Sequence, residues 1–289
     1  MPYVLFVDSG SNLPSRKLRE FSIQVISFPL EIDGRLTESP KYPDGFDGHS
    51  YYSGLRAGMS VKTSLISTGS YYQAFRPQVA AGRDVVYVGI SSGITGTVQS
   101  ARVAADMLME EFPGRAVRVV DSMGAGLGTG LLALRAADYR DQGLTADQAA
   151  AKLRYDAENL CEYFTVDDLQ FLRRTGRLSG AVAAIGTMLQ IKPLLRGDEA
   201  GHIVVCGKIR GRKRAIEELA RVYARRVVDA ARQRVAISHG DCLEEARLLA
   251  GRVREIAPPR ELILSLHEPL TGAHVGPGML ALFFFGSGR

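Results

Sequence analysis

The stretch YVGISSGITGTVQSA, residues 87–101, joins an apolar strand to a helix through a turn that carries no charged side chain. Hydroxyl groups and glycines fill this turn, and apolar residues then recur at steps of three and four as far as Phe112. This period predicts an amphipathic helix over Gly96–Phe112 that packs on a core. The turn would therefore offer backbone N–H groups at a helix N-terminus to an anion such as a carboxylate or phosphate.

The same alternation of strand and helix continues on both sides of this unit. In the first half we predict strands at 3–7, 24–32, 84–90 and 116–120, with the Gly/Pro/Asp-rich residues 33–48 as a loop or small flap. In the second half we predict a helix at 179–189 and strands at 161–166, 191–195, 203–206, 234–238, 262–266 and 280–285. We therefore expect two α/β domains, residues 1–156 and 157–289, the first with a largely parallel sheet and the second with a mixed sheet.

Three of the predicted strands end in a short polar sequence. These ends are Asp8-Ser9, Ser91-Ser92 and Asp121-Ser122. In open α/β sheets, ligands bind in the crevice beyond the carboxyl ends of the strands. We therefore expect the three turns to converge near a ligand.

Composition excludes several classes of protein. Hydrophobic residues make up 46% of the chain, charged residues 23%, and the net charge is +5, as in ordinary globular proteins. The longest strongly apolar run, Met279–Phe285, is far shorter than the ~20 residues that span a bilayer, so we expect a cytoplasmic protein. The three cysteines and five histidines show no metal-binding spacing, so no metal site is predicted.

Four glycines, at 124, 126, 128 and 130, follow the predicted strand at 116–120. They resemble a dinucleotide-binding fingerprint, but Thr129 and Leu131 occupy the two positions at which its third glycine would fall. Close helix packing, or close approach of the backbone to a ligand, explains the glycines better.

A second polar feature is His274, in TGAHVGPGML at residues 271–280, where small residues let other atoms approach closely. Its imidazole either meets a backbone carbonyl or contacts a ligand and orients Ser92. Ser92 with His274 also permits a nucleophile-and-base interpretation, although Ser92 is not the central serine of a G-x-S-x-G motif.

Two basic clusters form a third feature. Arg173, Arg174 and Arg177 make up the first, and five of the seven residues 208–214 are basic. A solvated face, a nucleic-acid site and a docking surface for an acidic protein or a phosphate all remain compatible with this pattern.

Taken together, these segments resemble the DegV family, which includes the FakB-type fatty-acid-binding proteins. The resemblance runs nearly end to end. It is carried by VDSGSNL from Val7, KTSLIST from Lys62, ISSGITGTVQSA from Ile90, FTVDDLQFLRRTGRLS from Phe164, IKPLL from Ile191, GKIRGRKRA from Gly207, HGD from His239 and GAHVGPG from Gly272.

The resemblance implies a DegV-like fold of two α/β domains that holds a long-chain fatty acid in a buried tunnel near their junction. The protein would be a carrier without catalytic residues, metal or cofactor of its own. It would present the carboxylate to a separate ATP-dependent kinase of the FakA type, which makes acyl phosphate for phospholipid synthesis. It would not bind nucleic acid or insert stably into membranes, although transient membrane contact fits this role.

By position in the matching motifs, two groups of residues acquire roles. The carboxylate would be bound by Thr63, Ser64, Ser91, Ser92, Gly93 and His274. The surface that meets the kinase would include Arg173, Arg174, Arg177, Arg210 and Arg212.

One departure from the family pattern lies beside this site. Leu65-Ile66 stand where the family commonly has Gln-Pro, which makes the surroundings of the carboxylate more apolar and leaves the acyl preference open. Two other functions remain as alternatives: a serine acyl hydrolase or acyltransferase that uses Ser92 and His274, and a basic nucleic-acid-binding module.

Overall fold

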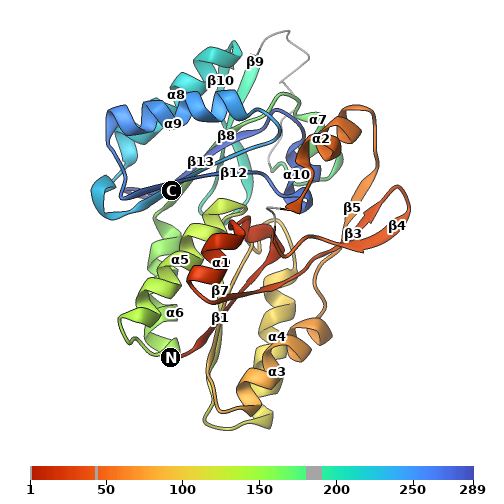
Figure 1. The fold of residues 1–289 in the computed structure, drawn as a ribbon, viewed down its shortest axis with the longest axis vertical. Coiled ribbons are helices and arrows are strands. Elements are labelled where there is room, and N and C mark those ends of the chain that lie inside the picture. The colour runs from red at the N-terminus through yellow and green to blue at the C-terminus, as the bar shows by residue number, and fades with distance from the viewer. Residues whose placement is uncertain (1, 43–44, 180–190) are drawn as a thin grey trace.

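The computed structural model describes residues 2–42, 45–179 and 191–289, and two β-sheets dominate it (Figure 1). The first sheet has four parallel strands in the order β2-β1-β6-β7. Its strands are β1 (Val4–Asp8), β2 (Ile23–Ile26), β6 (Val85–Gly89) and β7 (Val117–Asp121). All five residues of β6 are buried, as expected of a central strand covered by helices on both faces.

The second sheet has six strands in the order β10-β9-β8-β13-β11-β12. Only β11 and β12 run parallel to each other, so this sheet is mixed. Its strands are β8 (Leu160–Thr165), β9 (Ile191–Gly197), β10 (Ile203–Arg210), β11 (Arg234–His239), β12 (Glu261–Leu266) and β13 (Leu280–Phe285). The predicted α/β class, with one parallel and one mixed sheet, is confirmed.

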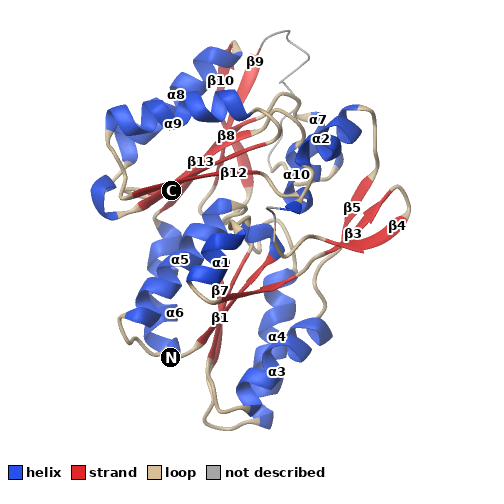
Figure 2. Cartoon of the chain, in the orientation of Figure 1, coloured by secondary structure: helices blue, strands red, loops and turns tan. Residues whose placement is uncertain are grey.

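Helix α5 (Leu127–Asp141) lies between the two sheets (Figures 1 and 2). It contacts β1 and β6 of the first sheet and β8, β11 and β13 of the second. Eleven of its fifteen residues are buried, as expected of a helix that is covered on two sides. The other α-helices of the described residues are α1 (Ser15–Glu20), α2 (Gly48–Arg56), α3 (Thr68–Ala80), α4 (Thr97–Glu111), α6 (Ala146–Glu158), α7 (Gln170–Arg174), α8 (Arg212–Arg226), α9 (Leu243–Ile256) and α10 (Pro269–Val275).

The hydrophobic core does not divide cleanly between the two halves of the chain. One cluster joins Leu5 and Val88 of the first sheet to Ala236 and Phe283 of the second through the apolar residues of α5. The predicted division after residue 156 falls within the last turn of α6 and stays a prediction. The shared core means that the space between the two sheets is enclosed by both halves of the chain.

One prediction in the first half was wrong in detail. The single strand expected at 24–32 is broken at 27–28 into β2 and β3 (Pro29–Ile32), which belong to different sheets. The segment expected as a loop or small flap contains β4 (Arg35–Glu38), and β4, β3 and β5 (Val61–Thr63) form a small antiparallel sheet. The helix expected at 179–189 lies, from residue 180 onward, outside the described residues.

Among the helices of the described ranges, none combines the length and the apolar character that a membrane crossing requires.

Candidate functional site

The carboxyl ends of β1, β6 and β7 meet, as the sequence predicts. The buried Asp8 carboxylate accepts hydrogen bonds from the Ile90 N–H (3.0 Å) and the Tyr87 hydroxyl (2.8 Å). The Ser91 N–H donates to the Gly124 carbonyl beyond β7 (2.8 Å). Burial raises the pKa of Asp8 to about 6, although these donors act in the opposite direction. The turns therefore form one hydrogen-bonded platform.

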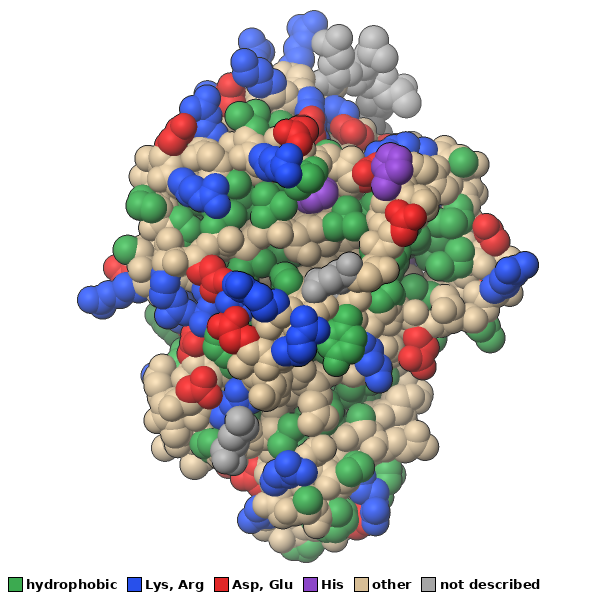
Figure 3. Space-filling model, viewed as in Figure 1, with side chains coloured by type: hydrophobic (Ala, Val, Ile, Leu, Met, Phe, Trp, Pro, Cys, Tyr) green, Lys and Arg blue, Asp and Glu red, His purple; other side chains and the backbone are tan. Residues whose placement is uncertain are grey.

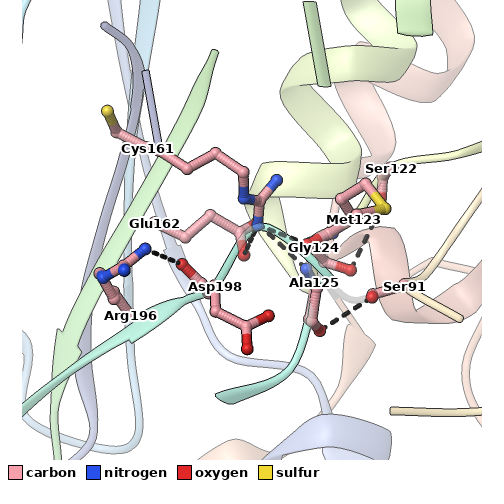
Figure 4. A network of polar contacts seen from close by, with 12 residues as sticks. Ser91, Ser122, Met123, Gly124, Ala125, Cys161, Glu162, Arg196 and Asp198 are labelled. Carbon is pink, nitrogen blue, oxygen red and sulfur yellow. Dashed lines mark hydrogen bonds and ion pairs between the residues drawn. The ribbon is translucent and has the colours of Figure 1, made fainter. Parts of the chain in front are cut away.

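Ser91 and Gly93 contact a neighbouring loop, and Ser92 contacts the end of β7. The Ser91 hydroxyl donates to the Gly201 carbonyl in the β9–β10 loop (2.9 Å), and Figure 4 shows this contact at the edge of a larger polar network. A Cβ atom at Gly93 would lie 2.7 Å from the Gly201 backbone, so only glycine permits this approach. Ser92 is exposed, and its N–H donates to the Asp121 carboxylate at 3.2 Å.

A cavity of about 330 Å³ lies between the two sheets. Glu162 and Phe164 on β8 face it together with Ala281 and Phe283 on β13, because directly opposed residues of an antiparallel pair share one face. Its apolar wall consists of Phe28, Leu65, Ile90, Ile94, Ala125, Phe164, Ile203, Leu270, Val275, Met279, Ala281 and Phe283. Ser91, Ser92 and Gly93 do not line the cavity. The Ser91 hydroxyl donates to the β9–β10 loop, the Ser92 N–H to Asp121 and the Gly93 N–H to the Ser91 hydroxyl.

Thr63, Ser64 and His274 do come together at the cavity wall. The Thr63 Oγ1 and His274 Nε2 atoms are 3.0 Å apart and hydrogen-bonded, which links β5 to α10. Burial, with further contributions from the charges of Arg177 and Arg174, lowers the pKa of His274 to about 4. The imidazole is therefore neutral at pH 7. Within the described residues its Nδ1 atom has no hydrogen-bond partner.

Thr95 and Gly96 line the cavity at the N-terminus of α4, and they were not among the predicted site residues. The Thr95 hydroxyl pairs with that of Thr97 (2.9 Å), and no side chain caps the helix. The first N–H groups of α4 are therefore not satisfied by a side chain, and the positive end of the helix dipole lies at the cavity. The sequence of the turn before α4 predicted that this helix N-terminus would face a ligand. It did not show which hydroxyl group of the turn would face the cavity.

The five predicted docking arginines fall in three environments. Arg173 and Arg174 are exposed on α7, and the Arg174 guanidinium lies over the Phe171 ring at 4.4 Å. Arg177 lines the cavity, so it lies in the wall of the site rather than on an outer surface alone.

Arg210 and Arg212, the other two, differ sharply in exposure. Arg210 is exposed at the end of β10, where Lys and Arg side chains gather at the end of the molecule formed by β10 and α8 (Figure 3). Arg212 is only 17% exposed and forms ion pairs with Glu245 (2.5 Å) and Asp167 (3.8 Å). Its guanidinium is therefore paired with carboxylates of the protein itself.

Leu65 and Ile66, which stand where the family commonly has Gln-Pro, lie in two different environments. Leu65 lines the cavity and is 50% exposed, whereas Ile66 is fully buried in the core beside the first sheet. An apolar side chain thus stands at the mouth of the cavity beside Thr63 and Ser64.

Three glycines before and within α5 pack closely against the second half of the chain, which is one of the two explanations that the sequence left open. Cβ atoms at Gly124 and Gly128 would overlap the Glu162 carboxyl, and one at Gly126 would lie 2.9 Å from the His267 ring. Glu162 was missed by sequence analysis, because a lone acidic residue in a predicted strand gives no local signal of burial.

The nucleophile-and-base alternative requires Ser92 to lie next to His274. The described contacts instead join His274 to Thr63, and they direct the Ser92 N–H toward Asp121. This geometry does not support Ser92 as an activated nucleophile.

Comparison with known proteins identifies the fold and the family. The sequence profile of the DegV family of uncharacterised proteins matches residues 3–287. A DegV domain-containing protein of Clostridium perfringens is 33% identical over 288 residues, which cover 98% of this chain and 97% of that protein.

Solved structures show the same likeness. A DegV family protein of Thermus thermophilus, described as binding fatty acid, is 28% identical with a TM-score of 0.86 over 99% of this chain and 100% of that one. DegV of Bacillus subtilis, described as a fatty-acid-binding protein, is 27% identical with a TM-score of 0.83 over 98% of each chain. The FakB-type label is consistent with these neighbours. The chain belongs to the DegV family.

Proposed function

We propose that this protein binds a long-chain fatty acid, with the carboxylate at the Thr63–His274 pair and the tail in the cavity between the sheets. The observation that carries this proposal is an apolar cavity whose wall includes one compact group of donors. Relatives of the same fold that are described as binding fatty acids support it.

The donor group has the chemistry that a carboxylate requires. If the neutral His274 donates its Nε2 proton to Thr63 Oγ1, the Thr63 hydroxyl is left to donate to the carboxylate. Arg177 and the N-terminus of α4 add positive charge at the same wall. These groups offset the several kcal/mol that burial of an unpaired carboxylate would cost.

The tail supplies most of the gross binding energy. Burial of a methylene group contributes about 0.8 kcal/mol, so a chain of about 16 carbons gains on the order of 10 kcal/mol before the costs of ordering. Head and tail contacts together favour an amphipathic ligand of the fatty-acid class over a small polar one.

We further propose that the protein acts as a carrier and presents its ligand to an ATP-dependent kinase of the FakA type in the cytoplasm. A carboxylate oxygen would attack the γ-phosphorus of ATP, ADP would leave, and acyl phosphate would form on the kinase. Arg173, Arg174 and Arg210 are the exposed candidates for the docking surface.

Native mass spectrometry followed by denaturation tests the carrier proposal. We expect one fatty acid per chain under native conditions and its complete release on denaturation. An acyl adduct on Ser92 that survives denaturation would instead support the hydrolase or acyltransferase alternative. Release of no lipid, together with failure to bind added palmitate, would contradict the proposal.

A further inference from the structure

Glu162 is a buried carboxyl in the wall of the cavity, among side chains that are mostly apolar. Its Oε1 atom accepts a hydrogen bond from the Ala125 N–H just before α5 (3.1 Å), and Figure 4 shows the two residues facing each other. Its Oε2 atom has no hydrogen-bond partner among the described residues. The nearest cation, Arg289, lies 3.9 Å away at Nη2.

Arg289 does not hydrogen-bond to the Oε2 atom of Glu162. Its Nη1 atom donates to the Ala157 carbonyl (2.9 Å) and its Nη2 atom to the Met123 carbonyl (2.5 Å). The guanidinium is therefore held by backbone oxygens, at a distance from Glu162 that gives attraction without a hydrogen bond. Both side chains are less than one tenth exposed.

The free Oε2 atom faces the cavity. It lies beside Gly124 and Gly197, and both of these glycines line the cavity wall. Side chains at Gly124 or Gly128 would overlap the carboxyl, so the backbone around Glu162 is shaped to admit this group. The backbone around Glu162 therefore accommodates a carboxyl group specifically at this position in the cavity wall.

The contact with the turn before α5 accounts for only half of this arrangement. Hydrogen bonding to the Ala125 N–H near the start of α5 explains Oε1, and a neutral amide oxygen would serve there as well. It leaves Oε2 in an apolar cavity without a partner, and such a group destabilises the protein unless something hydrogen-bonds to it. A saturated tail offers no such group, whereas a hydroxyl on the chain does.

We propose that the preferred ligand is a fatty acid with a hydroxyl group on its acyl chain, recognised by Oε2 of Glu162. This inference rests on the proposed function and narrows its ligand class. The hydroxyl donates to Oε2 when Glu162 is ionised. It accepts from the Oε2 proton when the carboxyl is protonated, so both forms of the side chain recognise it. Burial raises the pKa of Glu162 to about 7, which populates both forms near neutral pH.

A positional series of hydroxystearates, compared with stearate in competition binding to the full chain, tests this inference. We expect one position of the hydroxyl to bind on the order of 10-fold more tightly than stearate, the factor that one additional buried hydrogen bond provides. Hydroxyls placed elsewhere should bind more weakly than stearate, because they would be buried without a partner.

Two variants assign the preference to Glu162. Glu162→Gln keeps hydrogen-bonding capacity and should retain the preference, whereas the apolar Glu162→Met should abolish it and bind stearate at least as well as the parent protein. Glu244→Met, on the exposed surface of α9, is the control and should change neither ligand.

The outcomes separate the two proposals. If stearate binds but no hydroxystearate exceeds it, the inference is overturned and Glu162 only holds the turn before α5. If neither ligand binds, the proposed function fails as well. If the preference survives in Glu162→Met, a different group recognises the hydroxyl and the inference is overturned. Even if Glu162→Met does not fold, the series with the parent protein overturns the inference when no hydroxystearate binds more tightly than stearate.

Discussion

The Thr63→Val substitution tests the proposed head-group site most sharply, because it removes one hydroxyl while keeping the shape of the side chain. Thr63 Oγ1 is hydrogen-bonded to His274 Nε2 at 3.0 Å, and we expect it to donate its own proton to the carboxylate. A hydrogen bond to a charged group contributes about 1.5–3 kcal/mol. The affinity for palmitate should therefore fall by roughly 10- to 150-fold.

The small sheet supplies a matched control. Thr37 on β4 and Thr63 on β5 both pair with Leu30 of β3, one on each side, but Thr37 is exposed and does not line the cavity. Thr37→Val should leave the palmitate affinity unchanged. Isothermal titration of delipidated protein measures both variants. A Thr63→Val affinity within twofold of the parent value would refute the assigned carboxylate position.

Three further predictions follow from individual contacts. Gly128→Ala should lower the free energy of unfolding, measured by urea denaturation, by about 1–3 kcal/mol, because the new methyl group overlaps the buried Glu162 carboxyl. The control Gly251→Ala in α9, where the added methyl group meets no other atom, should be neutral or stabilising. Equal effects of the two substitutions would contradict the close packing at Gly128. Because the pKa of His274 is lowered to about 4, its neutral form stabilises the fold fully above pH 6.5 and loses this contribution as the pH falls toward 4. The stability difference between the parent and His274→Gln should change by about 1.4 kcal/mol per pH unit in that window, and a constant difference would disprove the shift. Arg212→Ala should lower the stability of the protein, because it removes the ion pairs with Glu245 and Asp167. Arg210→Ala should weaken kinase-dependent acyl-phosphate formation without a change in stability. Unchanged acyl-phosphate formation in Arg210→Ala would exclude Arg210 from the docking surface.

Local pattern was enough to predict the framework of the fold. The apolar period of residues 96–112 gave α4 with an error of one residue at each end, and the polar strand ends predicted the meeting of Asp8 with the Ile90 turn. These features depend on neighbours in sequence or on a general rule of parallel sheets. Close packing of the glycines before and within α5 was one of the two explanations that the sequence left open.

The composition of the cavity wall was less accessible, because it depends on long-range packing. Ser92 and Thr95 are three residues apart in the same turn, yet only Thr95 faces the cavity. The turn is oriented in this way because the Ser91 hydroxyl donates a hydrogen bond to the β9–β10 loop. Burial of Glu162 likewise depends on its position in β8 opposite Phe283. No local sequence feature identifies such a partner.

The central claim is that a fatty-acid carboxylate lies at the Thr63–His274 pair. Carbon-13 NMR of stearate labelled at its carboxyl carbon tests it most directly. The account predicts one sharp protein-bound resonance, distinct from that of free stearate, that shifts in Thr63→Val and is unmoved in Thr37→Val. A bound resonance that is identical in all three proteins would contradict the account.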